Sequence, residues 1–321
     1  MNENDIIDNY LKKLSINNSS SKFLNDDIFF DKKNKLAVTV DTYNEDVHFL
    51  NFDKPNLLIK KVLRSSLSDL ICKGINPKYY FISISSPRGI LNKKNLKLIS
   101  NSLINEQKKF NIYISGGDTN YSKKISFTLT CIGFGKKIIE RNNVKLNDDI
   151  YVTGNIGDSY IGLKILKNKI KYKNNYLKNY FEKKYYEPEL AYKFTKILNK
   201  YANSSIDVSD GLYDDLNKLI NKQKQGYRIY INKIPTSTNF KKILKINKLK
   251  LQDHLFHGDD YQILFTAPKK FRNVLISESQ LLKQKVTIIG EICSKSTKNF
   301  LTNGNSVLNT ADFKGYTHIF W

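Results

Sequence analysis

The apolar residues of this chain recur with two different periods, one typical of strands and one typical of helices. Strands are predicted at 36–49, 79–85 and 125–135, where apolar and polar residues alternate. Helices are predicted at 56–73 and 92–110, where apolar residues recur at helical spacing. The first part of the chain is therefore predicted to mix helices with strands long enough to form a sheet.

The second part of the chain continues this mixture with shorter elements. A basic stretch at 136–159 marks the boundary, so we expect an amino-terminal domain at 1–137 and a carboxy-terminal domain at 138–321. A helix at 188–201 would have Pro188 at its first position, where proline is favoured. The other predicted elements are helices at 5–14, 160–167, 212–222, 238–246 and 269–283, and strands at 150–154, 227–231 and 286–292.

Length and composition indicate an ordinary globular protein. The chain has 321 residues, which is enough for two domains and a sizeable core. No apolar run approaches the roughly 18 residues of a membrane span. The amino terminus lacks a signal-peptide layout, and the three cysteines form no CxxC or zinc spacing. We therefore expect a cytoplasmic protein with reduced thiols and no membrane partner.

The formal net charge of +23 raises the question of nucleic-acid binding. Only five of the 53 basic residues are arginine, the side chain that reads phosphates and bases with a planar fork. The lysines are spread along the whole chain, as expected for a solvated surface. We therefore expect no specific nucleic-acid partner, although polyanions should be attracted non-specifically at low salt.

The stretch SSIDVSDGL at 204–212 places carboxylates at the junction of a predicted strand and a predicted helix. Asp207, Ser209 and Asp210 offer only oxygen ligands, which suit hard cations such as Mg²⁺. The alternative is a helix cap, with Ser209 or Asp210 capping the helix that begins at Leu212. Taken alone, a cap is the simpler interpretation. The same arrangement recurs elsewhere in the chain, and that recurrence favours a metal site.

Acidic residues stand at predicted strand or helix ends in both parts of the chain. They are Asp27, Asp41, Asp69, Asp118, Asp207, Asp210 and Asp259. Taken singly, Asp41 also fits a turn, the glycines before Asp118 also fit a tight turn, and His48 fits a structural histidine. The chain has no His-rich or Cys-rich set, no P-loop and no protein-kinase motifs. Together the carboxylates indicate chemistry on a Mg²⁺-bound polyphosphate.

These motifs occur in the order typical of the thiamine-monophosphate kinase family, which the chain resembles over nearly its whole length. They are FLNDD, VDTYNEDVHF, LSDLICKGINP, SGGDTN, the Arg141 region before YVTGNIGDS, SSIDVSDGL, HGDDYQILF and FKGYTHIF. The family belongs to a superfamily with aminoimidazole ribonucleotide synthetase and selenophosphate synthetase. IDVSDGL, VDTYNEDVHF and GDDY separate this family from those relatives.

The resemblance implies that ATP and thiamine monophosphate react to thiamine diphosphate and ADP by direct in-line transfer, the last step of thiamine diphosphate biosynthesis. The implied Mg²⁺ ligands are Asp27, Thr39, Val40, Asp41, Asp69, Asp118, Asp207 and Asp210. The two implied catalytic residues are Asp207 and Asp210. The implied ATP contacts are Gly117, Asp118, Arg141 and Ser209. The implied contacts to thiamine monophosphate are His48, Asp259 and Tyr316.

The resemblance also implies a fold and an assembly. The expected fold class is a two-domain α/β and α+β protein. The sheet of its amino-terminal α/β domain would pair with that of a second subunit into a barrel, which implies a homodimer. The carboxy-terminal α+β domain would close the active-site cleft.

Several positions depart from the family pattern. Leu24 and Asn25 stand where glycines are usual, and Asp259 replaces a longer glutamate. Val40 replaces a threonine, so a metal contact at this position would be through the backbone. An arginine after SGGDT and arginines near Pro188 are missing. We expect weaker phosphate binding rather than loss of activity. The alternative functions are another ATP-dependent reaction of the superfamily, or a polyanion-binding protein that has lost catalysis.

Overall fold

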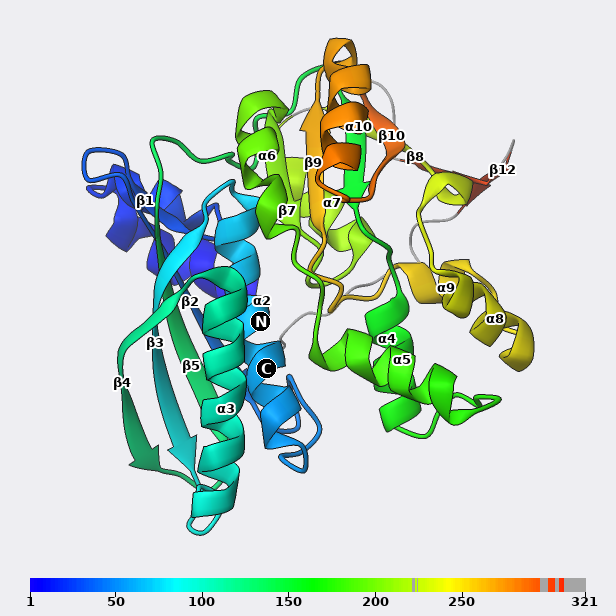
Figure 1. The fold of residues 1–321 in the computed structure, drawn as a ribbon. Coiled ribbons are helices and arrows are strands. Elements are labelled where there is room, and N and C mark those ends of the chain that lie inside the picture. Colours follow the sequence, from blue (N-terminus) through cyan, green and yellow to red (C-terminus); the bar gives the residue numbers. More distant parts are fainter. Residues whose placement is uncertain (221–222, 224, 295–299, 304–305, 309–321) are drawn as a thin grey trace.

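The computed structural model describes residues 1–220, 223, 225–294, 300–303 and 306–308, which form two mixed α/β halves (Figure 1). The chain opens with α1 (Glu3–Ile6), followed by short π and 3-10 turns, so the expected helix at 5–14 forms only in part. In the described residues, no helix is both long and apolar enough to cross a membrane.

The first half is built on a five-stranded sheet in the order β1-β2-β5-β3-β4. Its strands are β1 (Phe29–Asp31), β2 (Leu36–Asn44), β3 (Pro77–Ser86), β4 (Tyr113–Tyr121) and β5 (Ser126–Phe134). Only β3 and β4 pair in parallel. Helices α2 (Pro55–Cys72) and α3 (Lys93–Phe110) lie on the side of the sheet that faces the second half (Figure 1).

The second half is built on a seven-stranded sheet in the order β12-β11-β8-β10-β6-β9-β7. The strands are β6 (Asp149–Thr153), β7 (Ser204–Asp207), β8 (Gly226–Tyr230), β9 (Ile263–Ala267), β10 (Val286–Cys293), β11 (Phe300–Asn303) and β12 (Ser306–Leu308). The helices are α4 (Asp158–Leu166), α5 (Asn175–Tyr186), α6 (Thr195–Tyr201), α7 (Leu212–Ile220), α8 (Thr238–Asn247), α9 (Gln252–Leu255) and α10 (Arg272–Leu281).

The central strands of the second sheet are buried on both faces because they separate two hydrophobic cores. Tyr151 and Phe265 belong to a core that continues into the first half. Val152 and Leu264, their neighbours on the same strands, belong to a core enclosed within the second half. Side chains of a strand alternate between its faces, so this arrangement follows from the strand geometry. The shared core fixes the two halves against each other and creates the junction at which the acidic motifs meet.

Most predicted elements are confirmed, but three segments differ in instructive ways. The strand predicted at 36–49 ends at Asn44, whose carbonyl accepts hydrogen bonds from Val47 and His48 and closes a turn. The helix predicted at 188–201 begins only at Thr195. The carbonyls of residues 188 and 189 accept hydrogen bonds from side chains far away in the sequence rather than from a helix. No element was predicted between 168 and 187, where the structure forms α5.

Candidate active site

Helix α2 lies at the junction and presents polar side chains to the second half. Ser68 donates a hydrogen bond to Asp207, with 2.8 Å between Oγ and Oδ2. Lys61 lies on the same face, nearer the amino-terminal end of the helix. It forms an ion pair with Asp259, with 2.7 Å between Nζ and Oδ1. Lys73, just after the helix, is buried at the other end. Helix α2 therefore contacts a predicted metal ligand, Asp207, through Ser68 and a predicted substrate contact, Asp259, through Lys61.

Three predicted metal ligands lie close together in the middle of this junction. Burial raises the pKa of Asp69 well above its usual range, and the nearby charges of Asp41 and Asp207 raise it further. Burial also raises the pKa values of Asp41 and Asp207. Thr39 donates a 2.6 Å hydrogen bond to Asp69 Oδ2, so this predicted ligand belongs to the same cluster. A bound cation would relieve the mutual repulsion of these buried carboxylates.

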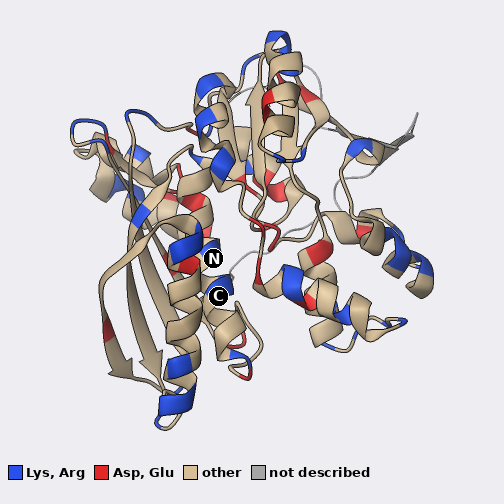
Figure 2. Ribbon diagram, viewed as in Figure 1, with Lys and Arg blue, Asp and Glu red and all other residues tan. Residues whose placement is uncertain are grey.

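The donor set of this cluster fits Mg²⁺ that is shared with a ligand. Figure 2 shows acidic segments gathered at the junction, whereas basic segments are spread over the outer helices. Across the described ranges, no three His, Cys, Asp or Glu side chains form a ready metal shell. Mg²⁺ is usually held by one or two carboxylates, with waters and substrate phosphates as its remaining ligands. Asp41, Asp69 and Asp207 are therefore suitable for holding a Mg²⁺–polyphosphate complex.

Asp27 has a different environment from the other predicted metal ligands. Its carboxylate forms a close ion pair with the Arg141 guanidinium, and Arg141 Nε also donates to its Oδ2 at 3.1 Å. Lys73 Nζ lies 2.9 Å from the same Oδ2 and 2.7 Å from Asp26 Oδ1. Both oxygens of Asp27 are thus occupied by cations. In this arrangement Asp27 orients Arg141, the predicted ATP contact.

The loop that follows β7 is organised by Asp215, a residue that the sequence did not single out. Its Oδ2 accepts hydrogen bonds from the backbone N–H groups of Asp210 and Gly211, each at 3.0 Å. Burial raises the pKa of Asp215 to about 7, although Lys218 opposes this shift. Lys218 forms ion pairs with both Asp210 and Asp215. The predicted catalytic Asp210 is therefore held by the buried Asp215 and the partly exposed Lys218, both on α7.

A cavity of about 410 Å³ lies beside this loop. Its lining includes His48, Ser209, Asp210 and Asp259, together with Lys61. Two predicted thiamine monophosphate contacts thus share one cavity with a predicted ATP contact and a predicted catalytic residue. Aromatic rings complete the wall, namely those of Tyr43, Phe49, Tyr160, Tyr185 and Tyr261. A cavity with an aromatic wall and a few charged groups suits an organic ligand that also carries charge.

Other predicted site residues lie apart from this cavity. The side chain of Val40 points away from the carboxylates, and the residue is 61% exposed on the outer face of the first sheet. Gly117 and Asp118 are exposed on β4, the edge strand. A Cβ at Gly117 would lie 1.8 Å from the carbonyl oxygen of Ile82, so glycine permits the close approach of β4 to β3. Tyr316 lies outside the described residues.

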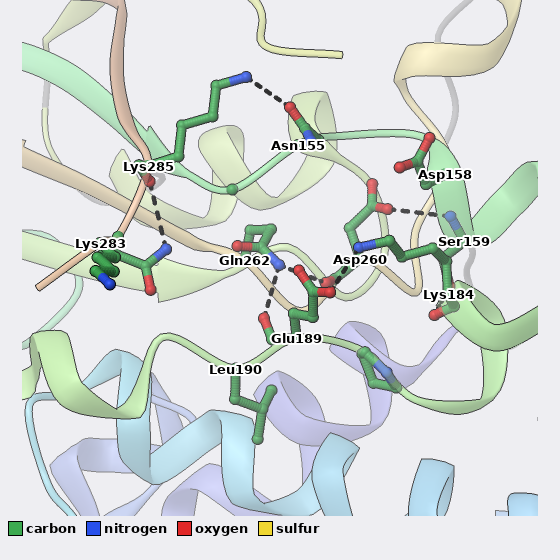
Figure 3. Close-up of a pocket in the computed structure, with 13 residues that line it drawn as sticks. Asn155, Asp158, Ser159, Lys184, Glu189, Leu190, Asp260, Gln262, Lys283 and Lys285 are labelled. Carbon is green, nitrogen blue, oxygen red and sulfur yellow. Dashed lines mark hydrogen bonds and ion pairs between the residues drawn. The ribbon is translucent and has the colours of Figure 1, made fainter. Parts of the chain in front are cut away.

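A second, smaller cavity of about 210 Å³ opens on the second half (Figure 3). Its acidic groups are committed to internal contacts. Asp260 accepts hydrogen bonds from the N–H groups of Gly157 and Ser159 at the start of α4. Asp158 accepts hydrogen bonds from Ser237 and Tyr180. These hydrogen bonds stabilise the turn at 154–159. The lining of the cavity contains none of the predicted site residues.

Sequence reasoning missed the lysines that organise the junction. Lys61 stands on the apolar stripe of the predicted helix at 56–73, which is an unusual position for a charged residue. That signal could have drawn attention to it. Its partner could not have been inferred, because Asp259 lies 198 positions away.

Known proteins are similar to this chain over most of its length. Residues 25–135 match the family described as AIR synthase related protein, N-terminal domain. The thiamine-monophosphate kinase of Buchnera aphidicola subsp. Acyrthosiphon pisum is 36% identical over 296 residues, covering 89% of this chain and 88% of that protein. The chain belongs to the thiamine-monophosphate kinase family. A second thiamine-monophosphate kinase, from Buchnera aphidicola subsp. Schizaphis graminum, is 35% identical and covers 96% of each chain.

Solved structures of this kinase family have the same fold. The structure described as AaThiL complexed with AMPPCP and TMP has a TM-score of 0.85 and 27% identity, covering 99% of this chain and 97% of that one. The thiamine monophosphate kinase of Aquifex aeolicus has a TM-score of 0.77, covering 93% of this chain and 99% of that one. Escherichia coli HypE, at 16% identity and a TM-score of 0.67, shares the fold alone. The expected family and two-part α/β fold are confirmed.

Proposed function

We propose that this protein transfers the γ-phosphoryl group of ATP to the phosphate of thiamine monophosphate, giving thiamine diphosphate and ADP. The observation that carries the proposal is the match to two thiamine-monophosphate kinases at 36% and 35% identity along most of the chain. The shared cavity supports it, because predicted contacts for both substrates line one space. The proposed setting is the cytoplasm, where both substrates would be available.

Each part of the junction has a proposed role in this reaction. Asp41, Asp69, Asp207 and Asp210 would hold Mg²⁺, which neutralises phosphate charge when it is bound. Arg141, oriented by Asp27, would contact the ATP phosphates together with Ser209. His48 and Asp259 would hold the acceptor. The acceptor oxygen is already a phosphate oxygen, so positioning and charge neutralisation, rather than a general base, would supply most of the catalysis.

The remaining predicted contacts fit a homodimer, which we propose as the working form. Val40, Tyr79 and Phe134 lie on the uncovered face of the first sheet and are exposed. β4 is exposed along its whole length at the sheet edge. Pairing with a second copy would cover this face and bring Gly117 and Asp118 into an enclosed site. We also propose that the chain divides into domains at 1–137 and 138–321.

The function is tested by ADP release from ATP and Mg²⁺ with thiamine monophosphate, thiamine or no acceptor. We expect ADP only with thiamine monophosphate, because the acceptor must supply a phosphate oxygen. EDTA should abolish the release. ADP formed equally in all three reactions, or none in any, would refute the proposal.

A further inference from the structure

Lys61 is a buried cation inside the cavity proposed to bind the acceptor. Only 2% of its side chain is exposed, and its Nζ lies 2.7 Å from Asp259 Oδ1. The ammonium also lies 4.0 Å from the centre of the Tyr185 ring and 5.6 Å from that of Tyr261. A lysine in such a place is costly unless its charge is compensated. The carboxylate and the two rings supply that compensation.

The same contacts leave one side of the Asp259 carboxylate available. Tyr261 donates a 3.0 Å hydrogen bond from its hydroxyl to Asp259, and it uses Oδ1, the oxygen that pairs with Lys61. In the part of the chain that the structure describes, no donor contacts Oδ2. Asp259 lines the cavity. One oxygen is thus fixed by the protein, while the other can accept a hydrogen bond or a positive charge from a ligand.

The backbone of Asp259 is fixed as firmly as its side chain. Its φ of +71° lies in the left-handed region, which costs energy for a residue other than glycine. Its N–H donates a 2.9 Å hydrogen bond to the carbonyl of Ser209, a predicted ATP contact. At the preceding Gly258, a Cβ would lie 1.8 Å from that same carbonyl oxygen. These contacts fix the position of Asp259 relative to Ser209, which belongs to the proposed nucleotide-binding loop.

We propose that Lys61 is a positioning residue for the acceptor, acting through Asp259. The inference rests on the proposed function. Lys61 holds Oδ1 so that Oδ2 faces the cationic, nitrogen-rich heterocycle of the acceptor rather than turning toward solvent or its phosphate. The ion pair with Lys61 also holds Asp259 in place although its side chain is one methylene shorter than the usual glutamate of the family. Lys61 thereby links acceptor recognition to α2, which carries Asp69 of the proposed metal cluster.

The test compares Lys61→Met with Lys60→Met. Lys60 is the neighbouring lysine on α2 and is also mostly buried, but its ion pair at 3.0 Å is with Glu187, which does not line the cavity. We expect Lys61→Met to raise the KM for thiamine monophosphate by about tenfold or more while the KM for ATP stays within about twofold. Lys60→Met should leave both KM values near those of the wild type.

A double-mutant cycle with Asp259→Asn identifies the route of the effect. If Lys61 acts through Asp259, then Lys61→Met should add little to the acceptor KM once Asp259→Asn is present. Because Asp259 is partly exposed, Asp259→Asn should fold, and it measures what the carboxylate contributes on its own. Equal rises in both KM values, additive effects of the two substitutions, or the same result for Lys60→Met would overturn the inference.

Binding measurements separate failure of this inference from failure of the proposed function. Titration calorimetry with thiamine monophosphate should show tighter binding to the wild type than to Lys61→Met. A wild type that phosphorylates thiamine monophosphate with Lys61→Met unchanged would overturn only the role of Lys61. A wild type that neither binds nor phosphorylates it would overturn both.

Discussion

Asp207 is the residue at which the two halves of the site meet. It ends β7 in the second half and accepts a hydrogen bond from Ser68 of the first half. We predict that Asp207→Asn lowers turnover by about a hundredfold or more, because one proposed Mg²⁺ ligand loses its charge while the shape of the side chain is kept. Steady-state kinetics with saturating ATP would measure this loss.

The control for Asp207→Asn is its stability. Asparagine can still accept the hydrogen bond from Ser68, and the substitution removes a charge whose burial is unfavourable. Thermal unfolding should therefore show a folded protein that is no less stable than the wild type. Near wild-type turnover by this folded variant would exclude Asp207 from the catalytic site.

At the scale of elements, the long periodic segments were predictable and the contacts between distant segments were not. Helix 56–73 was predicted within one residue at each end because its apolar spacing is local information. The helix expected at 188–201 starts late because Arg64 and Gln262 donate to the carbonyls of residues 188 and 189. The acidic motifs of the candidate site were visible in the sequence. The ion pairs of Lys61 and Lys73 were not, because each lysine pairs with carboxylates far away in the sequence.

Substitution of Lys73 tests how much the stability of the protein depends on a cation buried at this junction. Its Nζ contacts Asp26 and Asp27 and donates a 2.7 Å hydrogen bond to the carbonyl of Ser205. We predict that Lys73→Met lowers the free energy of unfolding by about 3 kcal/mol or more, because two mostly buried carboxylates lose a cation. Urea denaturation would measure the change. Lys94→Met, at an exposed position of α3, should change stability by less than about 0.5 kcal/mol.

At the scale of the whole molecule, the uncovered face of the first sheet predicts self-association. Phe134 is 53% exposed on that face, and introducing a charge there would oppose the burial that dimerisation requires. We predict that light scattering gives twice the 37.2 kDa chain mass for the wild type and a single chain mass for Phe134→Glu. Leu281→Glu, at an exposed position of α10, should remain dimeric. A wild type that is monomeric at every concentration tested would contradict the proposed assembly.

The central claim is that the junction transfers a phosphoryl group directly from ATP to thiamine monophosphate. The most direct measurement is a single turnover with γ-³²P-labelled ATP, thiamine monophosphate and Mg²⁺, in which the label is followed to its product. The account predicts label in thiamine diphosphate and none bound to the protein. Label on the protein, or in inorganic phosphate alone, would contradict it.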